Sequence, residues 1–357
     1  MATTTLTSPL AGTRFFDADH LQRWGSDCLR KVGMSQTDAD LLAQSLVQTS
    51  LWGVDSHGIA RLPHYLERLR RGSIRACPDI RVVTTGPCTA QVHGDQGQGI
   101  VVAHRANAVA MDLARANGIG AVGVSDSSHC GAMALYTRAA AAAGLVAFAF
   151  THADSIAAPQ GGYKPFLGTN PISMAFPRAG QEPVCLDMAT TSIPWNRVMN
   201  ARREGVDVPA GVAVDAAGQP STDAQQIRAL TPLGGQEFGH KGYAPALVID
   251  LLCGPLNGNP FGSQIPPMFA DLDAPRKLGA FLIVIDPMRF AGGPQLAAVV
   301  QTMALTLAAE PGAPLMPGDP ELAAQARRKA HGIPVEPGLL AEIDQWTQTL
   351  GVDKCES

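Results

Sequence analysis

The most constraining feature of this sequence is a regular alternation of helical and strand-like segments within its first half. The range 99–117 predicts a helix that ends at Gly118, and residues 119–125 follow as a buried strand. An Ala-rich segment over 131–143 predicts a second helix, and residues 145–151 predict a second buried strand. Because helices and strands that alternate in this way pack in layers around a core, we expect an α/β fold.

The segment from Gly118 to Gly123 matches G-x-G-x-x-G, the pattern that binds a dinucleotide in Rossmann folds. In those folds the pattern follows a strand and opens a helix, whereas here a helix precedes it and a strand follows. The reversed order favours a closely packed helix-to-strand turn. If the chain binds a nucleotide, we expect it to do so without a Rossmann unit.

Composition narrows the classes of partner. The chain has 357 residues, 46% of them hydrophobic, which is enough for a large core and for two or three domains. The net charge of -4 and the aromatic content of 5% argue against a nucleic-acid partner. No apolar run approaches the roughly 18 residues of a membrane span, so we expect no membrane partner. Seven scattered cysteines and the lack of a signal peptide predict a cytoplasmic protein with free thiols.

Residues 239–243 read Gly-His-Lys-Gly-Tyr and lead directly into an apolar, helix-like run that ends at Gly254. The start of a helix presents backbone N–H groups to an anion, and His240 and Lys241 add a donor and a cation there. We interpret this segment as an anion-binding helix start. The histidines elsewhere are dispersed, without H-x-x-x-H or H-E-x-x-H spacing, so we expect no metal site.

His129 follows the buried strand that ends near Ser125. Ligands of open α/β sheets bind at the carboxyl ends of strands, and a histidine there can take a hydroxyl proton as hydride leaves the same carbon. The neighbouring Ser127 and Ser128 are alternatively helix caps. The position favours a catalytic histidine.

A second histidine lies in a segment that starts at Asp55. On a predicted helix from His57 to about Arg71, the side chains of His57, Arg61 and Tyr65 share one face, and an arginine can hold a carboxylate with two hydrogen bonds. A solvated helix face capped by Ser56 explains the same pattern, so the residues alone leave both interpretations open.

Two polar segments, 168–171 and 187–191, flank strand-like runs, the first within a Gly- and Pro-rich region over 157–177 that predicts a loop. Each segment presents amides and hydroxyls suited to a phosphate or a ribose, and each is equally compatible with an ordinary turn.

Taken together, these motifs resemble the malate/L-lactate dehydrogenase family of NAD(P)-dependent oxidoreductases, which is unrelated to the Rossmann-type lactate and malate enzymes. The resemblance runs from about residue 16 to about residue 337. The motifs that carry it are, in order, Asp55-Ser56-His57-Gly58 with Arg61, Ser128-His129-Cys130-Gly131, Gly168-Thr169-Asn170-Pro171, Asp187-Met188-Ala189-Thr190 and Gly239-His240-Lys241-Gly242-Tyr243.

The resemblance implies an α/β fold with a non-Rossmann, mixed-sheet NAD(P)-binding domain and a largely helical second domain. We expect the cofactor domain to span residues 119–289. The helical, substrate-side domain would be discontinuous, over 1–118 plus 290–357, and would carry the contacts of a homodimer.

The resemblance also implies roles for individual residues. His129 is expected to be the acid/base catalyst, assisted by His57 and Ser56. Arg61, Tyr65 and Asp154 are expected to bind the substrate. The expected cofactor contacts are Thr169, Asn170, Asp187, Met188, Ala189, Thr190, His240, Lys241 and Gly242.

The implied reaction is hydride transfer between C2 of a small 2-hydroxy acid, or its 2-oxo product, and NAD or NADP, with NAD favoured. Similarity to the ureidoglycolate dehydrogenase branch of the family makes ureidoglycolate, oxidised to oxalurate, the expected substrate. Malate, lactate, sulfolactate, or reduction of a cyclic imine acid such as piperideine-2-carboxylate are the alternatives within the family. A non-catalytic cofactor-binding protein is the alternative from another class.

Overall fold

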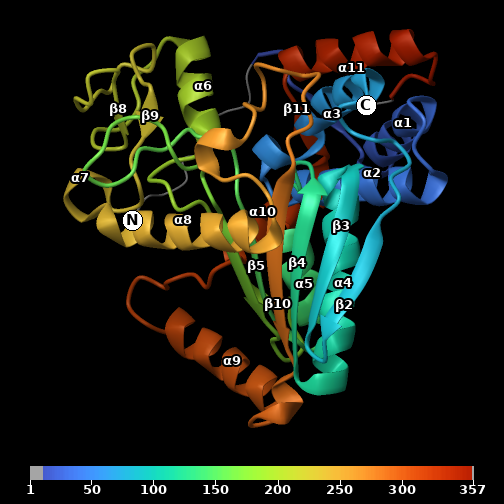
Figure 1. Cartoon of the computed structure of the whole chain (residues 1–357), viewed down its shortest axis with the longest axis vertical. Coiled ribbons are helices and arrows are strands. Elements are labelled where there is room, and N and C mark those ends of the chain that lie inside the picture. The colour runs from blue at the N-terminus through green and yellow to red at the C-terminus, as the bar shows by residue number, and fades with distance from the viewer. Residues whose placement is uncertain (1–10, 356–357) are drawn as a thin grey trace. The chain divides into compact units, whose positions relative to one another are not determined.

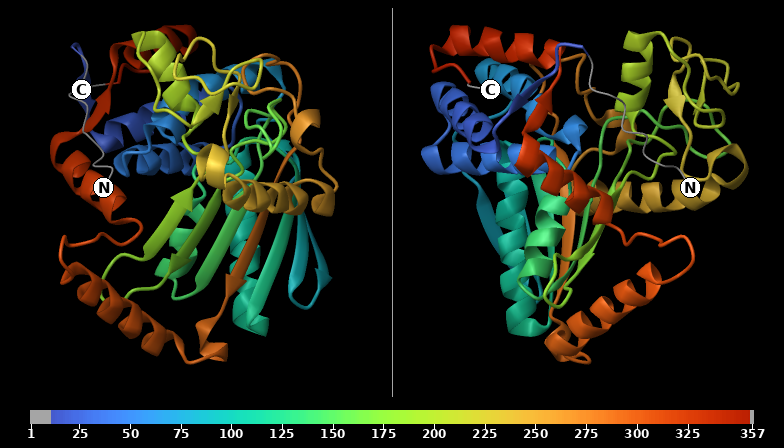
Figure 2. Two further views of the ribbon diagram at one scale, coloured as in Figure 1. Left: turned by 90° about the vertical axis from the view of Figure 1, so that its left-hand side faces the viewer. Right: turned by 180° about the vertical axis from the view of Figure 1, so that it is seen from behind.

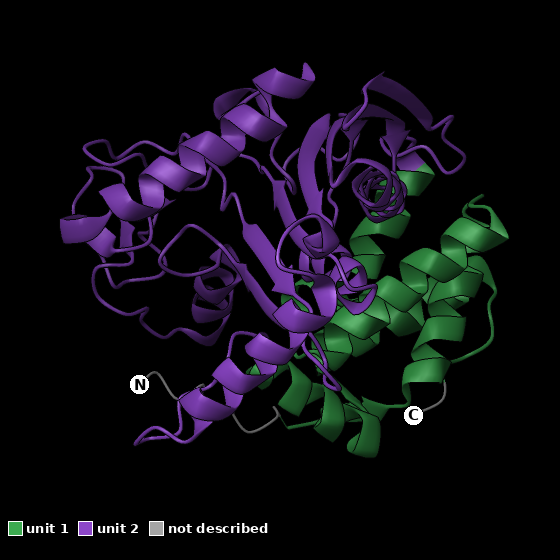
Figure 3. Cartoon of the chain, turned by 90° about the horizontal axis from the view of Figure 1, so that it is seen from below, with its two compact units in different colours: residues 1–70, 319–357 green, residues 71–318 purple. Residues whose placement is uncertain are grey.

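The structure is a computed structural model that describes residues 11–355. The chain forms two compact units, one of residues 1–70 and 319–357 and the other of residues 71–318 (Figure 3). We call them unit 1 and unit 2. Both the expected and the observed division are discontinuous, but the bounds differ. Residues 71–118, expected in the helical domain, belong to unit 2 because they supply two strands of its sheet and a helix packed on that sheet.

Unit 2 is built on a mixed seven-stranded sheet with the strand order β2-β3-β4-β10-β5-β6-β7. Within it β3 and β4 run parallel, and every other neighbouring pair is antiparallel. This mixed sheet confirms the expected fold class. Its strands are β2 (Arg81–Gly86), β3 (Thr89–Gly97), β4 (Ile119–Ser127), β5 (Val146–Thr151), β6 (Ile172–Phe176), β7 (Val184–Met188) and β10 (Leu278–Ile285).

Helices cover both faces of this sheet (Figures 1 and 2). On one face lie α4 and α5, whereas α8 lies on the other, where its Ile249 packs against Phe281 and Ile283 of β10. Because both faces are covered, β10 is a continuous apolar run, as is typical of strands buried on both sides. The helices of unit 2 are α4 (Gly99–Asn117), α5 (Ala134–Ala142), α6 (Trp195–Glu204), α7 (Gly235–Phe238), α8 (His240–Cys253) and α9 (Gly293–Ala308).

The G-x-G-x-x-G segment is a packed helix-to-strand turn, as its reversed order predicts. Gly118 ends α4 with a left-handed φ of 91°. A Cβ at Gly120 would lie 2.2 Å from the carbonyl oxygen of Ala110 in α4, and one at Gly123 would lie 1.7 Å from Oδ1 of Asn257. Each glycine therefore has a conformational or packing role.

A small lobe of unit 2 is formed by α6 and a two-stranded sheet of β8 (Ala213–Val214) and β9 (Ala229–Leu230). Its own core joins Val198 of α6 to Ile227 and Leu230. The guanidinium of Arg202 stacks on Trp195 at 5.3 Å and donates to the carbonyl oxygens of Ala224 and Ile227.

Unit 1 is mainly helical, as expected for the second domain. Asp17 caps α1 by accepting the N–H groups of Asp19 and His20, and Ser35 caps α2 by accepting that of Asp38. A short sheet pairs the two chain segments of the unit. Its elements are β1 (Arg14–Phe16), α1 (Ala18–Lys31), α2 (Gln36–Leu51), α3 (Leu62–Arg71), α10 (Asp319–His331), β11 (Ile333–Val335) and α11 (Pro337–Leu350).

The helix predicted from His57 to about Arg71 is wrong in its first part. Two short 3₁₀ turns, Asp55–His57 and Ile59–Arg61, precede α3, which begins only at Leu62. Gly58 separates the turns, and a Cβ there would lie 2.1 Å from Oγ of Ser50. That hydroxyl accepts the N–H of Ile59, so a contact with α2 overrides the local helical pattern.

Within residues 11–355, no helix has the length and apolarity that crossing a membrane requires.

Candidate functional site

Five strand ends meet at one edge of the sheet in unit 2. Strands β4 and β5 both run antiparallel to β10, β6 runs antiparallel to β5, and β7 runs antiparallel to β6. The C-terminal ends of β4, β5 and β7 therefore lie beside the N-terminal ends of β6 and β10. This is the upper edge of the sheet in Figure 1. His129, Asp154, Thr169 and Asp187 lie at or within a few residues of these ends. Residues predicted from three separate motifs, together with Asp154, are thus brought to one edge.

The loop that carries His129 is held at its backbone. Gly99, at the start of α4, donates its N–H to Oγ of Ser128 at 2.8 Å. The hydroxyl of Tyr136 donates to the carbonyl oxygen of Cys130 at 2.6 Å, deep in the unit. Ser128 is therefore a cap, as one alternative predicted, but it caps α4 rather than the helix that follows it.

The imidazole of His129 is partly exposed, and its Nδ1 accepts the N–H of Gly131 at 3.4 Å. A neutral ring with an acceptor at Nδ1 carries its proton on Nε2. The contact with Gly131 turns Nδ1 toward the backbone and leaves Nε2 as the nitrogen that can face a substrate.

The two polar segments predicted to bind the cofactor are bonded to each other. Thr190 donates its N–H and its hydroxyl to the carbonyl oxygen of Thr169, both at 2.9 Å. The hydroxyl of Thr190 also lies 3.1 Å from the carbonyl oxygen of Asn170. Leu233 donates its N–H to the carbonyl oxygen of Thr190 at 2.8 Å and thereby adds the segment just before α7.

The first turn of α8 contains His240, Lys241 and Gly242. A Cβ at Gly242 would lie 2.3 Å from the backbone nitrogen of Leu233, so this glycine lets the helix approach that segment. Lys241 is exposed, and its Nζ lies 5.5 Å from the ring centre of Phe238. Within residues 11–355, no carboxylate pairs with Lys241.

The expected cofactor contacts divide into two groups. Asn170, Thr190 and Gly242 are buried and hold the framework. Asp187 also supports the framework, because one of its carboxylate oxygens accepts the N–H of Ala134 at the start of α5. The second group has side chains that are at least partly exposed and can reach a ligand: Thr169, Asp187, Met188, Ala189, His240 and Lys241. A hydroxyl, a helix start and an unpaired cation form a donor set that suits the phosphates and ribose of a dinucleotide.

Asp154 forms a buried ion pair with Arg276 and accepts the N–H of Met268 at 3.1 Å through its other carboxylate oxygen. Arg276 is 3% exposed and lies just before β10. Asp154 was predicted to bind substrate directly. Both of its oxygens already have protein partners, so any substrate contact must share them.

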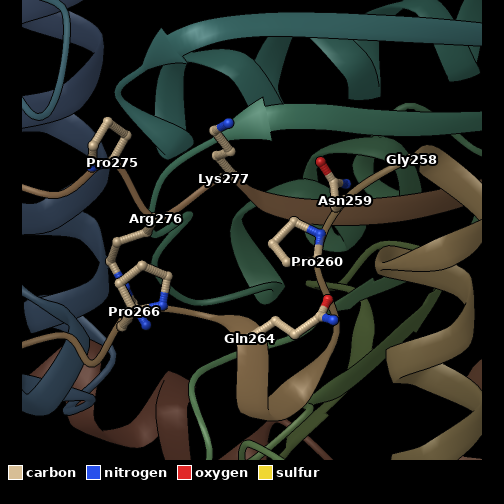
Figure 4. Close-up of a pocket in the computed structure, with 8 residues that line it drawn as sticks. All are labelled: Gly258, Asn259, Pro260, Gln264, Pro266, Pro275, Arg276 and Lys277. Atoms are coloured by element: carbon tan, nitrogen blue, oxygen red, sulfur yellow. Dashed lines mark hydrogen bonds between the residues drawn. The ribbon is translucent and has the colours of Figure 1, made fainter.

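Beside this ion pair the structure has a pocket of about 520 Å³ (Figure 4). Lys277 gives it a positive charge, whereas the charge of Arg276 is balanced by Asp154, and Asn259 and Gln264 add amide groups. Lys277 precedes Leu278, which pairs with Ser127 at the end of β4, so the pocket belongs to the same sheet edge. Its lining consists of Gly258, Asn259, Pro260, Gln264, Pro266, Pro275, Arg276 and Lys277.

Unit 1 contains the other group of predicted residues. Oγ of Ser56 lies 2.8 Å from Nδ1 of His57, and Nε of Arg61 donates to the carbonyl oxygen of Ser56. Burial, together with the nearby Arg61 charge, lowers the pKa of His57 to about 4, so its ring is neutral at physiological pH. Tyr65 on α3 is fully buried.

The segment that carries Ser56 and His57 is fixed by an ion pair within unit 1. Arg328 of α10 contacts both carboxylate oxygens of Asp55, at 2.5 and 2.8 Å, and donates to the carbonyl oxygen of Ser50. Asp55 thus joins the two chain segments of the unit.

Sequence reasoning missed Arg276, Lys277 and the buried pair of His152 and Asp250. The available signal was the pair of cations directly before an apolar strand, since a charge at a strand end is exposed to a ligand. Nothing local in the sequence links Asp154 to an arginine 122 positions later. Within the described range 11–355, no cluster of three His, Cys, Asp or Glu side chains is arranged to hold a metal ion.

Comparison with known proteins identifies the family. The family described as malate/L-lactate dehydrogenase matches residues 16–344. The chain belongs to this family. It is therefore an NAD(P)-dependent dehydrogenase that acts on a CH–OH group.

Characterised family members resemble the chain over most of its length. It is 38% identical to ureidoglycolate dehydrogenase (NAD(+)) of Escherichia coli O157:H7, over 74% of each chain. It is 34% identical to L-sulfolactate dehydrogenase of Methanothermobacter thermautotrophicus, over 89% of this chain and 92% of that enzyme.

A solved structure agrees with the fold. Malate dehydrogenase of Entamoeba histolytica superposes with a TM-score of 0.90 at 26% identity, covering 96% of this chain and 99% of that one.

Proposed function

We propose that this enzyme transfers a hydride between C2 of a small 2-hydroxy acid and a nicotinamide, with ureidoglycolate, oxidised to oxalurate, as the first candidate. The observation that carries the proposal is the meeting of His129 with the bonded segments around Thr169 and Thr190 at one sheet edge. The name of the Escherichia coli relative supports this acid.

His129 moves the proton. In oxidation the C2–H bond breaks with its electron pair, the C–O bond gains double-bond character, and the hydroxyl proton passes to His129. In reduction the imidazolium of His129 gives a proton to the carbonyl oxygen and becomes neutral. The nicotinamide supplies the chemistry of accepting or donating the hydride.

The group of predicted residues that includes Arg61 is assigned to the acid. Arg61 holds the substrate carboxylate, because a guanidinium matches a carboxylate in geometry and charge. The neutral ring of His57 and the hydroxyl of Ser56 hydrogen-bond to the substrate and orient C2, and Tyr65 closes the site.

The cofactor is held by Thr169, Asp187, Met188, Ala189, His240 and Lys241, with Asn170, Thr190 and Gly242 supporting them from the framework. Lys241 and the first turn of α8 bind its phosphates. We favour NAD over NADP because a 2′-phosphate needs a cation beside the ribose, whereas the guanidinium of Arg202 is engaged by Trp195 and two carbonyl oxygens. The names of relatives include both cofactors: ureidoglycolate dehydrogenase of Escherichia coli is named for NAD(+), and (2R)-3-sulfolactate dehydrogenase of Chromohalobacter salexigens is named for NADP(+).

The positive pocket favours a second candidate, an acid with two anionic groups such as malate or sulfolactate. The exposed Lys277 suits a second carboxylate or a sulfonate. The engagement of Asp154 by Arg276 weakens the fit of Asp154 to a neutral ureido group. Reduction of a cyclic imine acid is the remaining alternative within the family, since a piperideine-2-carboxylate reductase has the same fold with a TM-score of 0.85.

The enzyme is a cytoplasmic homodimer. All seven cysteines are free, which fits a reducing compartment. The helix α9 carries no charged residue, and Val299, Met303 and Leu305 on it are 56 to 60% exposed. A helix that is apolar on every side is normally covered, and we assign a second copy of the chain to this surface. Sedimentation of M303E tests this: we expect a monomer, and an unchanged dimer would contradict the assignment.

Cofactor and substrate are tested together by turnover. Purified protein with NAD or NADP is offered ureidoglycolate, malate, lactate and sulfolactate, and with NADPH a cyclic imine acid. Formation or loss of the reduced nicotinamide is followed by its absorbance. We expect ureidoglycolate to give the highest kcat/KM. A higher value with malate or sulfolactate would select the second candidate, and cofactor binding without turnover of any acid would support the non-catalytic cofactor-binding protein.

A further inference from the structure

A buried polar network lies beneath the sheet edge, and none of the roles assigned so far uses it. His152 directly follows β5 and is 1% exposed, and Asp250 on α8 is 3% exposed. Nε2 of His152 accepts the N–H of Gly279 in β10 at 2.9 Å. Nδ1 lies 3.4 Å from Oδ1 of Asp250. The imidazole thus accepts a hydrogen bond from β10, and its other nitrogen, which has no hydrogen-bond partner among residues 11–355, faces the carboxylate on α8.

The hydrogen bond from Gly279 fixes the tautomer of this ring. Since Nε2 is the acceptor, the neutral ring carries its proton on Nδ1, the nitrogen that faces the carboxylate of Asp250. Oδ2 of Asp250 accepts the N–H of Gly262 at 3.1 Å. A buried carboxylate needs several donors of this kind, so removal of any one is costly.

Asn170 connects this pair to the cofactor segments. Its Nδ2 donates to the carbonyl oxygen of Ala246 in α8 at 2.9 Å and lies 3.5 Å from Asp250. Its Oδ1 accepts the N–H of Ala153 at 3.2 Å. Because the carbonyl oxygen of Asn170 also contacts the hydroxyl of Thr190, the network continues into the 187–191 segment.

We propose that His152 is a positioning residue for the nicotinamide cofactor. By joining α8 to β10, it fixes the direction of the helix whose first turn presents His240 and Lys241. The same contacts fix the chain segments that present Asp154 and Thr169. The contacts at Ala246 and Asp250 lie within about three turns of the start of α8 and constrain its position, although Pro245 interrupts its backbone hydrogen bonding between them and the first turn. The inference rests on the proposed function, since it assumes that these segments bind the cofactor.

The test compares H152L, which cannot bridge, with H152Q, whose amide can accept from Gly279 and donate to Asp250. The affinity for NADH is measured by fluorescence titration without substrate, and thermal unfolding is measured on the same samples. We expect H152L to raise the Kd for NADH about 10-fold, the scale of one lost buried partner. H152Q should stay close to the wild-type value.

T137V is the matched control. Thr137 on α5 is fully buried in the same unit and hydrogen-bonds with Ser173, away from the His152 network. Its loss should lower the unfolding temperature without changing the Kd for NADH. If His152 had only a structural role, H152L would likewise lower the unfolding temperature and leave the Kd for NADH unchanged.

Two results would overturn the proposal: a wild-type Kd in folded H152L, or equal weakening by H152L and H152Q. If H152L does not fold, D250N replaces it, because an amide at position 250 keeps the volume but removes the carboxylate that faces Nδ1. A wild-type Kd in D250N would equally overturn it. A wild-type protein that binds neither NADH nor NADPH would instead contradict the proposed function.

Discussion

Thr190 donates both its backbone N–H and its hydroxyl to one atom, the carbonyl oxygen of Thr169. Two segments that are separate in sequence therefore form one surface at the sheet edge. Leu233 extends the surface to the start of α8, where Gly242 allows close approach. The account of function depends on this surface and on His129 beside it.

Replacement of His129 by alanine should lower kcat about 100-fold or more, because that is the usual scale of a lost acid/base group. Steady-state turnover measures this, and the Kd for NADH should remain near the wild-type value. His331→Ala, which removes an exposed histidine at the end of α10, is the control. Turnover of H129A close to that of wild type would remove His129 from the mechanism.

Replacement of Arg61 by methionine should raise KM for the acid by about 10-fold or more, because a buried or half-buried charged hydrogen bond contributes on the order of 1.5–3 kcal/mol. The effect on kcat should be smaller. Since Nε of Arg61 also holds Ser56, R61K is the useful comparison: it keeps the charge but loses the planar contact. An unchanged KM in R61M would exclude Arg61 from substrate binding.

The neutral state of His57 predicts a pH dependence of stability. Its pKa falls from 6.5 to about 4 on folding, so between these values the unfolded chain binds more protons than the native one. The contribution of the neutral His57 ring to the free energy of unfolding is therefore complete above pH 6.5 and is lost as the pH falls toward 4. Urea unfolding of H57Q across this range should show a flatter dependence than wild type, and an identical dependence would contradict the assignment.

Substitution of Gly242 by alanine should destabilise the protein by about 1–3 kcal/mol, the range for overpacking, and should weaken cofactor binding. The added Cβ would meet backbone atoms of Leu233, which cannot rotate away. Gly338→Ala in α11 is the control, because a Cβ there meets nothing within 4 Å. Denaturant unfolding and NADH titration report the two effects, and a G242A protein as stable as G338A would refute the packing argument.

Local signals explain which parts of the fold could be predicted. The bounds of α4 were correct because Gln98 caps its start with its side chain and Gly118 ends it in a left-handed conformation. Asp17 and Ser35, which cap α1 and α2, are also residue types that are typical of helix caps. In each case the deciding contact lies within a few residues of the helix end, so it can be predicted from the local sequence.

Long-range contacts explain what could not be predicted. The strand β6 lies inside the Gly- and Pro-rich region expected to be a loop, because its pairing partners β5 and β7 decide its conformation. The break at Gly58 depends on Ser50 in a different helix. The order of the motifs was sufficient for the family, whereas the ion pair of Asp154 with Arg276 required the fold.

The most direct test of the central claim is the turnover of NAD(P) by the wild-type protein with the 2-hydroxy acid panel, compared with H129A under the same conditions. We predict reduction of the nicotinamide by at least one acid, most rapidly by ureidoglycolate, and its near loss in H129A. Absence of turnover with every acid and both cofactors, or equal rates in wild type and H129A, would contradict the account.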